Sequence, residues 1–226
     1  MDSPIAPIDA SVNKILLVDD HPAIREALAL RIAEHSDLAV SREAHSIATA
    51  LEALRTQRPD VVIVDITLKD GNGIELIKSI QAHDDSIRIL VCSMHDEAIY
   101  AERAIRAGAM GYITKEHATT EIIQAIRRII DNKLYISDQL AEALMHRSLG
   151  KGQPRANAES VHLLSDRELE VFEFMGQGVE TAQIAERMHV SPKTVDTYRA
   201  RIKDKLGVQT MAELIRRAVE WKIEKK

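Results

Sequence analysis

Acidic side chains follow two apolar runs of this sequence, at the points where strands would end. Asp19 and Asp20 come directly after Ile15–Val18, and Asp65 follows Val61–Val64. Apolar runs of this length, rich in branched residues, are typical of strands buried on both faces of a parallel sheet. Ligands bind at the carboxyl ends of such strands, so the three carboxylates should meet at one edge. A lone acid there is usually a helix cap, but three acids on two strands indicate a site for a cation or a proton.

Two more polar residues, Ser93 and Lys115, follow the next two expected strands. With the three acids they make a set suited to receiving a phosphoryl group. Two acids and a backbone carbonyl would bind Mg²⁺, which prefers oxygen ligands, and the third acid would attack phosphorus. The hydroxyl and the ammonium would then neutralise phosphoryl oxygens. An aspartyl phosphatase or phosphotransferase uses similar groups, but it needs a second acid two residues after the nucleophile, where this chain has Thr67.

Alternating apolar patterns predict the elements that position these residues. Strands are expected near 14–19, 38–42, 60–65, 87–92 and 111–114, and helices near 22–35, 46–57, 73–83, 96–107 and 118–131. Strands that alternate with helices in this way predict an α/β fold with a doubly wound, five-stranded parallel sheet. Such a sheet would bring all five polar residues to one edge.

The first 131 residues resemble the receiver domain of two-component response regulators. The matching positions, in order, are Asp19-Asp20, Asp65, Ser93 and Tyr112-x-x-Lys115. The resemblance implies a flavodoxin-like fold and a phosphate transferred to Asp65 from a histidine kinase. It also implies a Mg²⁺ site made by Asp20, Asp65 and the backbone carbonyl of Thr67, with Asp19 helping through water and Lys115 pairing with the acceptor or its phosphate.

In this family Ser93 and Tyr112 would form the switch. A hydrogen bond from Ser93 to the new phosphate would draw in its loop and leave room for the Tyr112 ring to turn inward. Alone, Tyr112 would be interpreted as an exposed strand aromatic. One departure from the family is Lys69 in place of a common proline, which predicts a freer loop with an extra local charge. His21, beside the acid pair, resembles a metal ligand but is better interpreted as a helix-start residue, since Mg²⁺ prefers oxygen. Thr67 and His95 are candidates for setting the dephosphorylation rate.

Composition restricts the remaining possibilities. The chain has 226 residues, 45% of them hydrophobic but only 3% aromatic, which disfavours stacking on single-stranded nucleic acid. Its one cysteine, Cys92, lies in an apolar run and is expected to be a core residue. We expect a cytoplasmic protein without a membrane partner, because no apolar run approaches the roughly 20 residues of a membrane helix and the acidic opening lacks signal-peptide features.

The last third of the chain has a different character. Residues 161–226 hold 12 Lys and Arg against 11 Asp and Glu, although the whole chain has a net charge of -5. After a flexible linker at 149–160, the pattern becomes wholly helical, with a capping box at Ser165–Glu168, a cap at Thr181, another at Ser191-Pro192 and a stop at Gly207. The helices on either side of residues 189–191 predict a helix-turn-helix, small and all-α.

Helical spacing divides the second helix of this motif into two faces. The residues expected to pack inward are Val195, Tyr198, Ile202 and Leu206, which leaves Lys193, Asp196, Thr197 and Ala200 free to enter a major groove. Five basic residues against two acids between Lys193 and Lys205 supply attraction to phosphates.

Residues 163–221 resemble the LuxR/NarL-type DNA-binding domain. The match runs through Leu164-Ser165-x-Arg167-Glu168, Ile184-Ala185, Ser191-Pro192-Lys193-Thr194-Val195 and Lys205-Leu206-Gly207-Val208. It implies base contacts at Asp196, Thr197 and Ala200, and Lys193, Thr194 and Arg201 complete the predicted DNA-binding set. Many members carry lysine at the position of Asp196, which could instead accept from a cytosine amino group. In this family the last helix forms a dimer seam, expected here at Leu214, Ala218 and Trp221 or their neighbours.

Together these observations predict a receiver domain at 12–133, a linker with a short helix at 134–160 and a DNA-binding domain at 161–226. The predicted function is that of a transcription factor, not an enzyme, which binds promoter DNA and is a homodimer when active. Phosphorylation would either free the DNA-binding domain from the receiver or promote dimerisation, and the sequence leaves both routes open. Two alternatives remain: a phosphate-transferring enzyme, and a receiver that no longer takes phosphate and acts as a constitutive DNA-binding or interaction protein.

Overall fold

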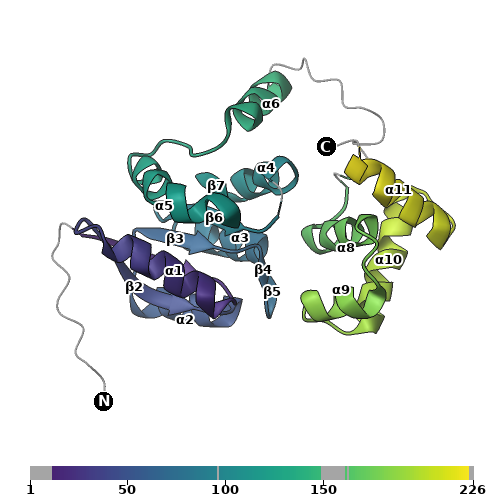
Figure 1. The fold of residues 1–226 in the computed structure, drawn as a ribbon, viewed down its shortest axis with the longest axis horizontal. Coiled ribbons are helices and arrows are strands. Elements are labelled where there is room, and N and C mark those ends of the chain that lie inside the picture. The colour runs from purple at the N-terminus through teal and green to yellow at the C-terminus, as the bar shows by residue number, and fades with distance from the viewer. Residues whose placement is uncertain (1–11, 96, 149–160, 162, 224–226) are drawn as a thin grey trace. The chain divides into compact units, whose positions relative to one another are not determined.

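The computed structural model describes residues 12–95, 97–148, 161 and 163–223. The chain divides into two compact units, Met1–Ser148 and Leu149–Lys226, shown in Figure 1. The linker expected at 149–160 lies outside the described residues.

The first unit contains a five-stranded parallel sheet with the strand order β2-β1-β3-β6-β7. Its strands are β1 (Asn13–Val18), β2 (Leu38–Ala44), β3 (Val61–Val64), β6 (Arg88–Ser93) and β7 (Gly111–Thr114). Val18 of β1 is in register with Val64 of β3, and the amide of Asp65 donates to the carbonyl of Val18 at 2.9 Å. Asp19 and Asp65 therefore leave the sheet side by side, which confirms the predicted fold class and explains why these acids meet.

Helices cover both faces of the sheet (Figure 1). They are α1 (Pro22–Ala33), α2 (Ile47–Thr56), α3 (Gly73–His83), α4 (Glu97–Ala107) and α5 (Lys115–Ile130). A further helix, α6 (Asp138–Ser148), follows them in the chain. Alternate strand residues such as Ile15 and Leu17 pack in one buried cluster with Leu28 of α1 and with Ile122 and Ile126 of α5. Buried aliphatic side chains of this kind each stabilise the fold by roughly 1.5–3 kcal/mol, so the sheet is a rigid base for residues at its edge.

Two local features differ from the sequence prediction. Helix α5 begins at Lys115 rather than near 118, with Thr114 as its N-cap residue, so Lys115 stands in the first helical turn. The loop after Asp65 is not free: β4 (Thr67–Leu68) and β5 (Gly71–Asn72) pair as a short antiparallel hairpin. The Asp70 carboxylate accepts from the first two amides of α2, at 2.7 and 2.9 Å. This charge therefore anchors the loop instead of loosening it.

The segment after α5 returns to the sheet. Tyr135 forms a parallel bridge with Gly111 of β7, and its backbone exchanges hydrogen bonds of 2.9 Å with Met110 and Tyr112. The short helix expected near 138–148 is present as α6 and packs against α4. Residues 134–148 thus belong to the first unit, whereas the sequence placed the receiver boundary at 133.

The described residues of the second unit form helices α8 (Asp166–Gly176), α9 (Thr181–Arg187), α10 (Pro192–Leu206) and α11 (Met211–Ile223). Ser165 and Glu168 make the predicted capping box, and Ser191 caps α10 by accepting from the amide of Thr194 at 3.1 Å. Gly207 ends α10 with a left-handed φ of 67°, as predicted. Thr181 is not a cap: it is the first residue of α9, after Glu180, and its hydroxyl accepts from Arg199.

Candidate functional site

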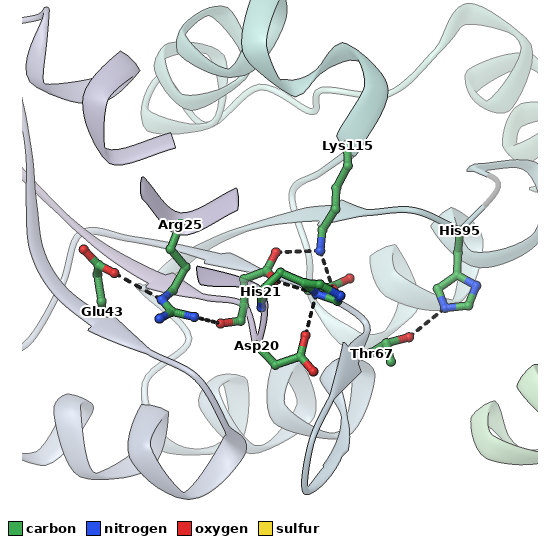
Figure 2. A network of polar contacts seen from close by, with 9 residues as sticks. Asp20, His21, Arg25, Glu43, Thr67, His95 and Lys115 are labelled. Carbon is green, nitrogen blue, oxygen red and sulfur yellow. Dashed lines mark hydrogen bonds and ion pairs between the residues drawn. The ribbon is translucent and has the colours of Figure 1, made fainter. Parts of the chain in front are cut away.

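The five polar residues predicted to converge lie at one edge of the sheet. Asp19 and Asp20 follow β1, Asp65 follows β3, Ser93 ends β6 and Lys115 opens α5 directly after β7. The ammonium of Lys115 lies 2.6 Å from Oδ2 of Asp19 and 2.7 Å from Oδ2 of Asp65. Residues separated by up to 96 positions in sequence are thus joined by one lysine that bridges two carboxylates (Figure 2).

This cluster is buried and has more acid than base. Asp19, Asp20, Asp65 and Lys115 are each 3–8% exposed. Burial raises the pKa of Asp65 above its ordinary value, the neighbouring Asp19 raises it further, and Lys115 opposes both. Burial also works against the charge of Lys115, but the Asp65 and Asp19 carboxylates outweigh it and leave the pKa of that amine raised. Lys115 therefore stays protonated as long as the Asp19 and Asp65 carboxylates are charged.

The donor set fits a hard divalent cation. Ligand atoms of Asp19, Asp20, His21 and Asp65 all lie within 4.8 Å of one another. In the described part of the chain, Oδ1 of Asp65 is buried without a hydrogen-bond partner. A buried carboxylate oxygen without a partner is costly, so this atom is available for a cation. Carboxylates are the ligands that Mg²⁺ prefers.

The turn between β1 and α1 holds the acids in place. The amide of His21 donates to Oδ1 of Asp19 at 2.8 Å, and Pro22 opens α1, where a missing amide costs nothing. Arg25, which the sequence reasoning missed, donates to the backbone carbonyl of Asp19 at 2.6 Å and to Glu43 at 3.1 Å (Figure 2). An arginine one turn into the helix after the acid pair is the signal that could have revealed this support.

Thr67 and His95 meet beside the acids. Oγ1 of Thr67 lies 2.9 Å from Nε2 of His95, although the two residues are 28 positions apart (Figure 2). Their side chains thus connect the β4–β5 hairpin to the loop after β6. The role expected for the Thr67 carbonyl, as a metal ligand, stays a prediction.

Tyr112 and Ser93 are both turned into the fold. Ser93 is fully buried and its hydroxyl accepts from the amide of His95 at 3.4 Å. Tyr112 is 2% exposed, and its hydroxyl donates to the carbonyl of His95 at 2.9 Å. Tyr112 is therefore not the exposed strand aromatic of the simplest interpretation. Through His95, it holds the loop that follows Ser93.

In the second unit, α9, the turn after it and α10 form the predicted helix-turn-helix. Val195, Ile202 and Leu206 are buried, as expected, while Tyr198 is only half-buried. The predicted groove-facing residues Lys193, Asp196, Thr197, Ala200 and Arg201 are exposed, and Thr194 is partly buried beside the Ser191 cap. Helix α10 thus has one exposed face that carries Lys193 and Arg201, and its N-terminus is capped by Ser191.

A charge pair ties this helix to α8. Glu168 is 3% exposed; its carboxylate accepts from the amide of Ser165 at 2.7 Å and from Lys205 at 2.6 Å. Burial acts to raise the pKa of Glu168, but the hydrogen bonds from Lys205 and Ser165 outweigh it and leave the pKa lowered. The capping residue of α8 therefore also positions the end of α10.

The three residues named for the predicted dimer seam on α11 are buried, so the seam stays a prediction for their exposed neighbours. Leu214 and Ala218 are fully buried and Trp221 is 5% exposed, because all three pack into their own unit. The Trp221 ring lies 5.6 Å from the Phe172 ring of α8. These side chains are core residues, since a small helical unit uses the apolar stripe of its last helix to close its own core. Exposed neighbours on the same helix are Met211 and Ile215, at 39% and 42%.

Across the part of the chain that the structure describes, every helix is too short or too polar to cross a membrane.

Comparison with known proteins gives matches over both units. Residues 15–127 match the response regulator receiver domain, and residues 162–218 match the bacterial regulatory proteins of the luxR family. The response regulator GacA of Pseudomonas syringae pv. syringae is 36% identical over 208 residues, which cover 91% of this chain and 95% of that protein. The DNA-binding transcriptional activator DevR/DosR of Mycobacterium tuberculosis is 32% identical over 211 residues, covering 92% and 95%.

Solved structures give the same picture. A two-component response regulator of the LuxR family from Aurantimonas has a TM-score of 0.56 and 35% identity, covering 62% of this chain and 99% of that one. Promoter-bound RcsB from Salmonella enterica serovar Typhimurium, solved with a phosphate mimic, has a TM-score of 0.59, 23% identity and coverage of 91% and 98%. At that identity the second likeness supports the fold alone.

Proposed function

This chain belongs to the response regulators that join a receiver domain to a LuxR-type DNA-binding domain, and we propose that it is a transcription factor switched by phosphorylation of Asp65. The observation that carries the proposal is the buried Asp65 carboxylate, with Oδ2 held by Lys115 at 2.7 Å and Oδ1 without a hydrogen-bond partner among the described residues. A carboxylate held in this way is oriented for attack and can still bind a cation.

Asp65 would take the phosphoryl group from a histidine kinase. The phosphorus–nitrogen bond to the kinase histidine breaks, a phosphorus–oxygen bond to Asp65 forms, and the imidazole keeps the electron pair. Lys115 holds the acceptor before transfer and pairs with the phosphoryl oxygens afterwards. This role requires a charged amine, which agrees with the raised pKa of Lys115 in a site that contains two adjacent carboxylates.

Asp20, Asp65 and the Thr67 carbonyl would hold Mg²⁺, with Asp19 contributing through water. Mg²⁺ bound there supplies charge neutralisation for the transferring phosphoryl oxygens. The alternative of a phosphate-transferring enzyme needs an acid at the position of Thr67, whose hydroxyl instead contacts His95 at 2.9 Å. Because position 67 is a threonine whose hydroxyl is engaged with His95, the site favours a phosphorylation switch over a phosphate-transferring enzyme.

Ser93 and Tyr112 would carry the signal away from the acceptor. Both are linked to the backbone of His95, one through its amide and the other through its carbonyl. A phosphoryl group on Asp65 would recruit the Ser93 hydroxyl, which would break its long contact with that amide and shift the loop before α4. Phosphorylation would then change the population of two loop arrangements, not the fold.

The output would be binding to promoter DNA through α10. Lys193, Thr197 and Ala200 lie on its exposed face, and Asp196 would accept from a cytosine amino group. Asp196 lies 3.5 Å from Arg199 of its own helix, an ion pair that would set the direction of its carboxylate. We place the homodimer contact on the exposed part of α11, around Met211 and Ile215, instead of the buried residues first expected. A chain acting in this way would work in the cytoplasm, beside DNA.

Phosphate incorporation decides the central claim. The full chain is incubated with ³²P-labelled acetyl phosphate and MgCl₂, and Asp65→Asn is compared with the exposed control Asp85→Asn. We expect about one phosphate per chain in the wild type and the control, and none in Asp65→Asn. Absence of label from the wild type would support the constitutive binding protein, and rapid release of many phosphates per chain would support the enzyme.

Promoter binding tests the output. DNA fragments protected by the phosphorylated chain are first selected from genomic DNA, and binding is then compared for Thr197→Ala and for Gln209→Ala, an exposed residue outside α10. Loss of a base contact should cost about 1–3 kcal/mol for the first variant only. Equal binding by both variants, with helix content intact, would refute the groove assignment.

A further inference from the structure

His21 lies against the acid cluster without a part in the function proposed above. Its Nδ1 is 2.7 Å from Oδ1 of Asp20 and 3.3 Å from Oδ1 of Asp19 (Figure 2). We propose that His21 is a further metal ligand, which makes the receiver site prefer a first-row transition-metal dication such as Mn²⁺ over Mg²⁺. This inference rests on the proposed metal site at Asp20 and Asp65 and concerns only which ion that site prefers.

The spacing of the donor atoms suits a shared ion. Two adjacent ligands of an octahedral ion with bonds of about 2.1 Å lie roughly 3 Å apart. The two distances from Nδ1 of His21 to the neighbouring carboxylate oxygens fall on either side of that value. Together with Asp65, these donors lie within 4.8 Å of one another, so an ion could contact an oxygen of Asp20 and the imidazole nitrogen with little movement.

The backbone fixes His21 in this place. It is the N-cap residue of α1 and precedes Pro22; its amide donates to Asp19, and its carbonyl accepts from Ile24 and Arg25. The imidazole side chain is 62% exposed, whereas the carboxylates of Asp19 and Asp20 are almost fully buried. The carboxylates thus form the floor of the site, and the ring stands at its solvent-facing rim, where water ligands would otherwise complete the coordination.

Nitrogen at this rim changes the preference among metals. Mg²⁺ gains little from an imidazole, whereas the first-row transition-metal dications gain more, least for Mn²⁺ and increasingly for the later metals up to Cu²⁺. The second histidine beside the site, His95, already contacts the Thr67 hydroxyl through Nε2 at 2.9 Å. His21 is therefore the better candidate for an imidazole ligand.

Mn²⁺ binding to the full, unphosphorylated chain tests the proposal. The fall in the free Mn²⁺ signal in electron paramagnetic resonance gives the affinity, and electron spin echo modulation by ¹⁴N reports imidazole coordination. Mg²⁺ affinity is measured by displacement of Mn²⁺. The variants are His21→Gln, Asp20→Asn and the control His83→Gln, which changes the last residue of α3.

We expect imidazole ¹⁴N modulation in the wild type and in His83→Gln, and its loss in His21→Gln. His21→Gln should lose at least roughly tenfold in Mn²⁺ affinity, the lower end of the loss seen when even a supporting partner of a metal ligand is removed, with Mg²⁺ affinity nearly constant. Mn²⁺ binding that depends on Asp20 but shows no imidazole coupling would overturn the role of His21 alone. Equal strengthening of both ions in His21→Gln would also overturn it, because His21 would then be a competitor. Mn²⁺ binding that ignores Asp20→Asn would overturn the proposed metal site itself.

Discussion

Replacing Asp65 with asparagine should stabilise the receiver unit when divalent cations are absent. The carboxylate is 3% exposed, and burial and Asp19 together raise its pKa above the ordinary 3.8. A raised pKa means that the charged form is less favourable in the fold than in water, by about 1.4 kcal/mol per pKa unit. Asparagine keeps the shape and an acceptor for Lys115, which also retains Asp19 at 2.6 Å. We therefore expect a higher free energy of unfolding and a higher Tm, with each kcal/mol gained raising Tm by roughly 3 °C for a unit of this size.

The pH dependence has a definite sign. An acid whose pKa is raised on folding costs no stability below its unfolded-state pKa, and the cost grows as the pH rises through the folded-state pKa. The advantage of Asp65→Asn should therefore be full above the folded-state pKa of Asp65 and disappear as the pH falls toward the ordinary carboxyl value of 3.8.

Mg²⁺ should reverse the ranking. At a hundredfold excess over its dissociation constant, a bound ion stabilises the folded protein by about 2.7 kcal/mol, whereas the variant lacks one anionic ligand. Thermal melting followed by circular dichroism, in EDTA and in MgCl₂, measures both arms, with Asp85→Asn as the exposed control. A variant that melts below the wild type in EDTA at neutral pH would refute the reasoning that the acceptor is held at a cost.

Three further predictions concern other parts of the chain. Glu168→Gln should destabilise the second unit by about 1 kcal/mol in urea unfolding at neutral pH, since it weakens the α8 cap and the ion pair with Lys205. Because folding lowers the pKa of Glu168, this loss of stability should fade as the pH drops below the unfolded-state pKa of 4.5. Gly176→Ala should cost about 1–3 kcal/mol in the same assay, because its Cβ would lie 2.6 Å from the Ala218 carbonyl oxygen, and an unchanged midpoint would contradict the close packing of α8 and α11. Cys92 should react with a thiol reagent only after unfolding, since burial raises its pKa to about 12; fast labelling of the native chain would contradict this.

The acid cluster was predictable because its geometry follows from strand pattern alone. Once Ile15–Val18 and Val61–Val64 are identified as buried parallel strands, the residues after them must emerge at one edge. The capped ends of α8 and α10 were predictable for a similar reason, since Ser165 and Ser191 act on amides three residues away in sequence.

The features that were missed depend on contacts between distant elements. The Thr67–His95 contact joins loops 28 positions apart, and the β4–β5 hairpin has strands of two residues, too short for any periodic signal. The burial of the three named α11 residues was missed for another reason. The apolar stripe through Leu214, Ala218 and Trp221 predicts that something covers this face, but it does not say whether a second copy or α8 does so.

The charge balance of the site explains why the proposed switch acts through hydroxyls and backbone amides. A dication and the Lys115 ammonium together would balance the charges of Asp19, Asp20 and Asp65. A phosphoryl group then adds about one further negative charge to a pocket whose bases are already engaged. An uncharged donor at the same edge is Ser93, which is fully buried, accepts from the amide of His95 at 3.4 Å and acts to lower the pKa of Asp65 by hydrogen bonding to it. A hydrogen bond from this hydroxyl to one added negative charge contributes a few kcal/mol. That is the scale needed to shift the balance between two loop arrangements without unfolding the sheet.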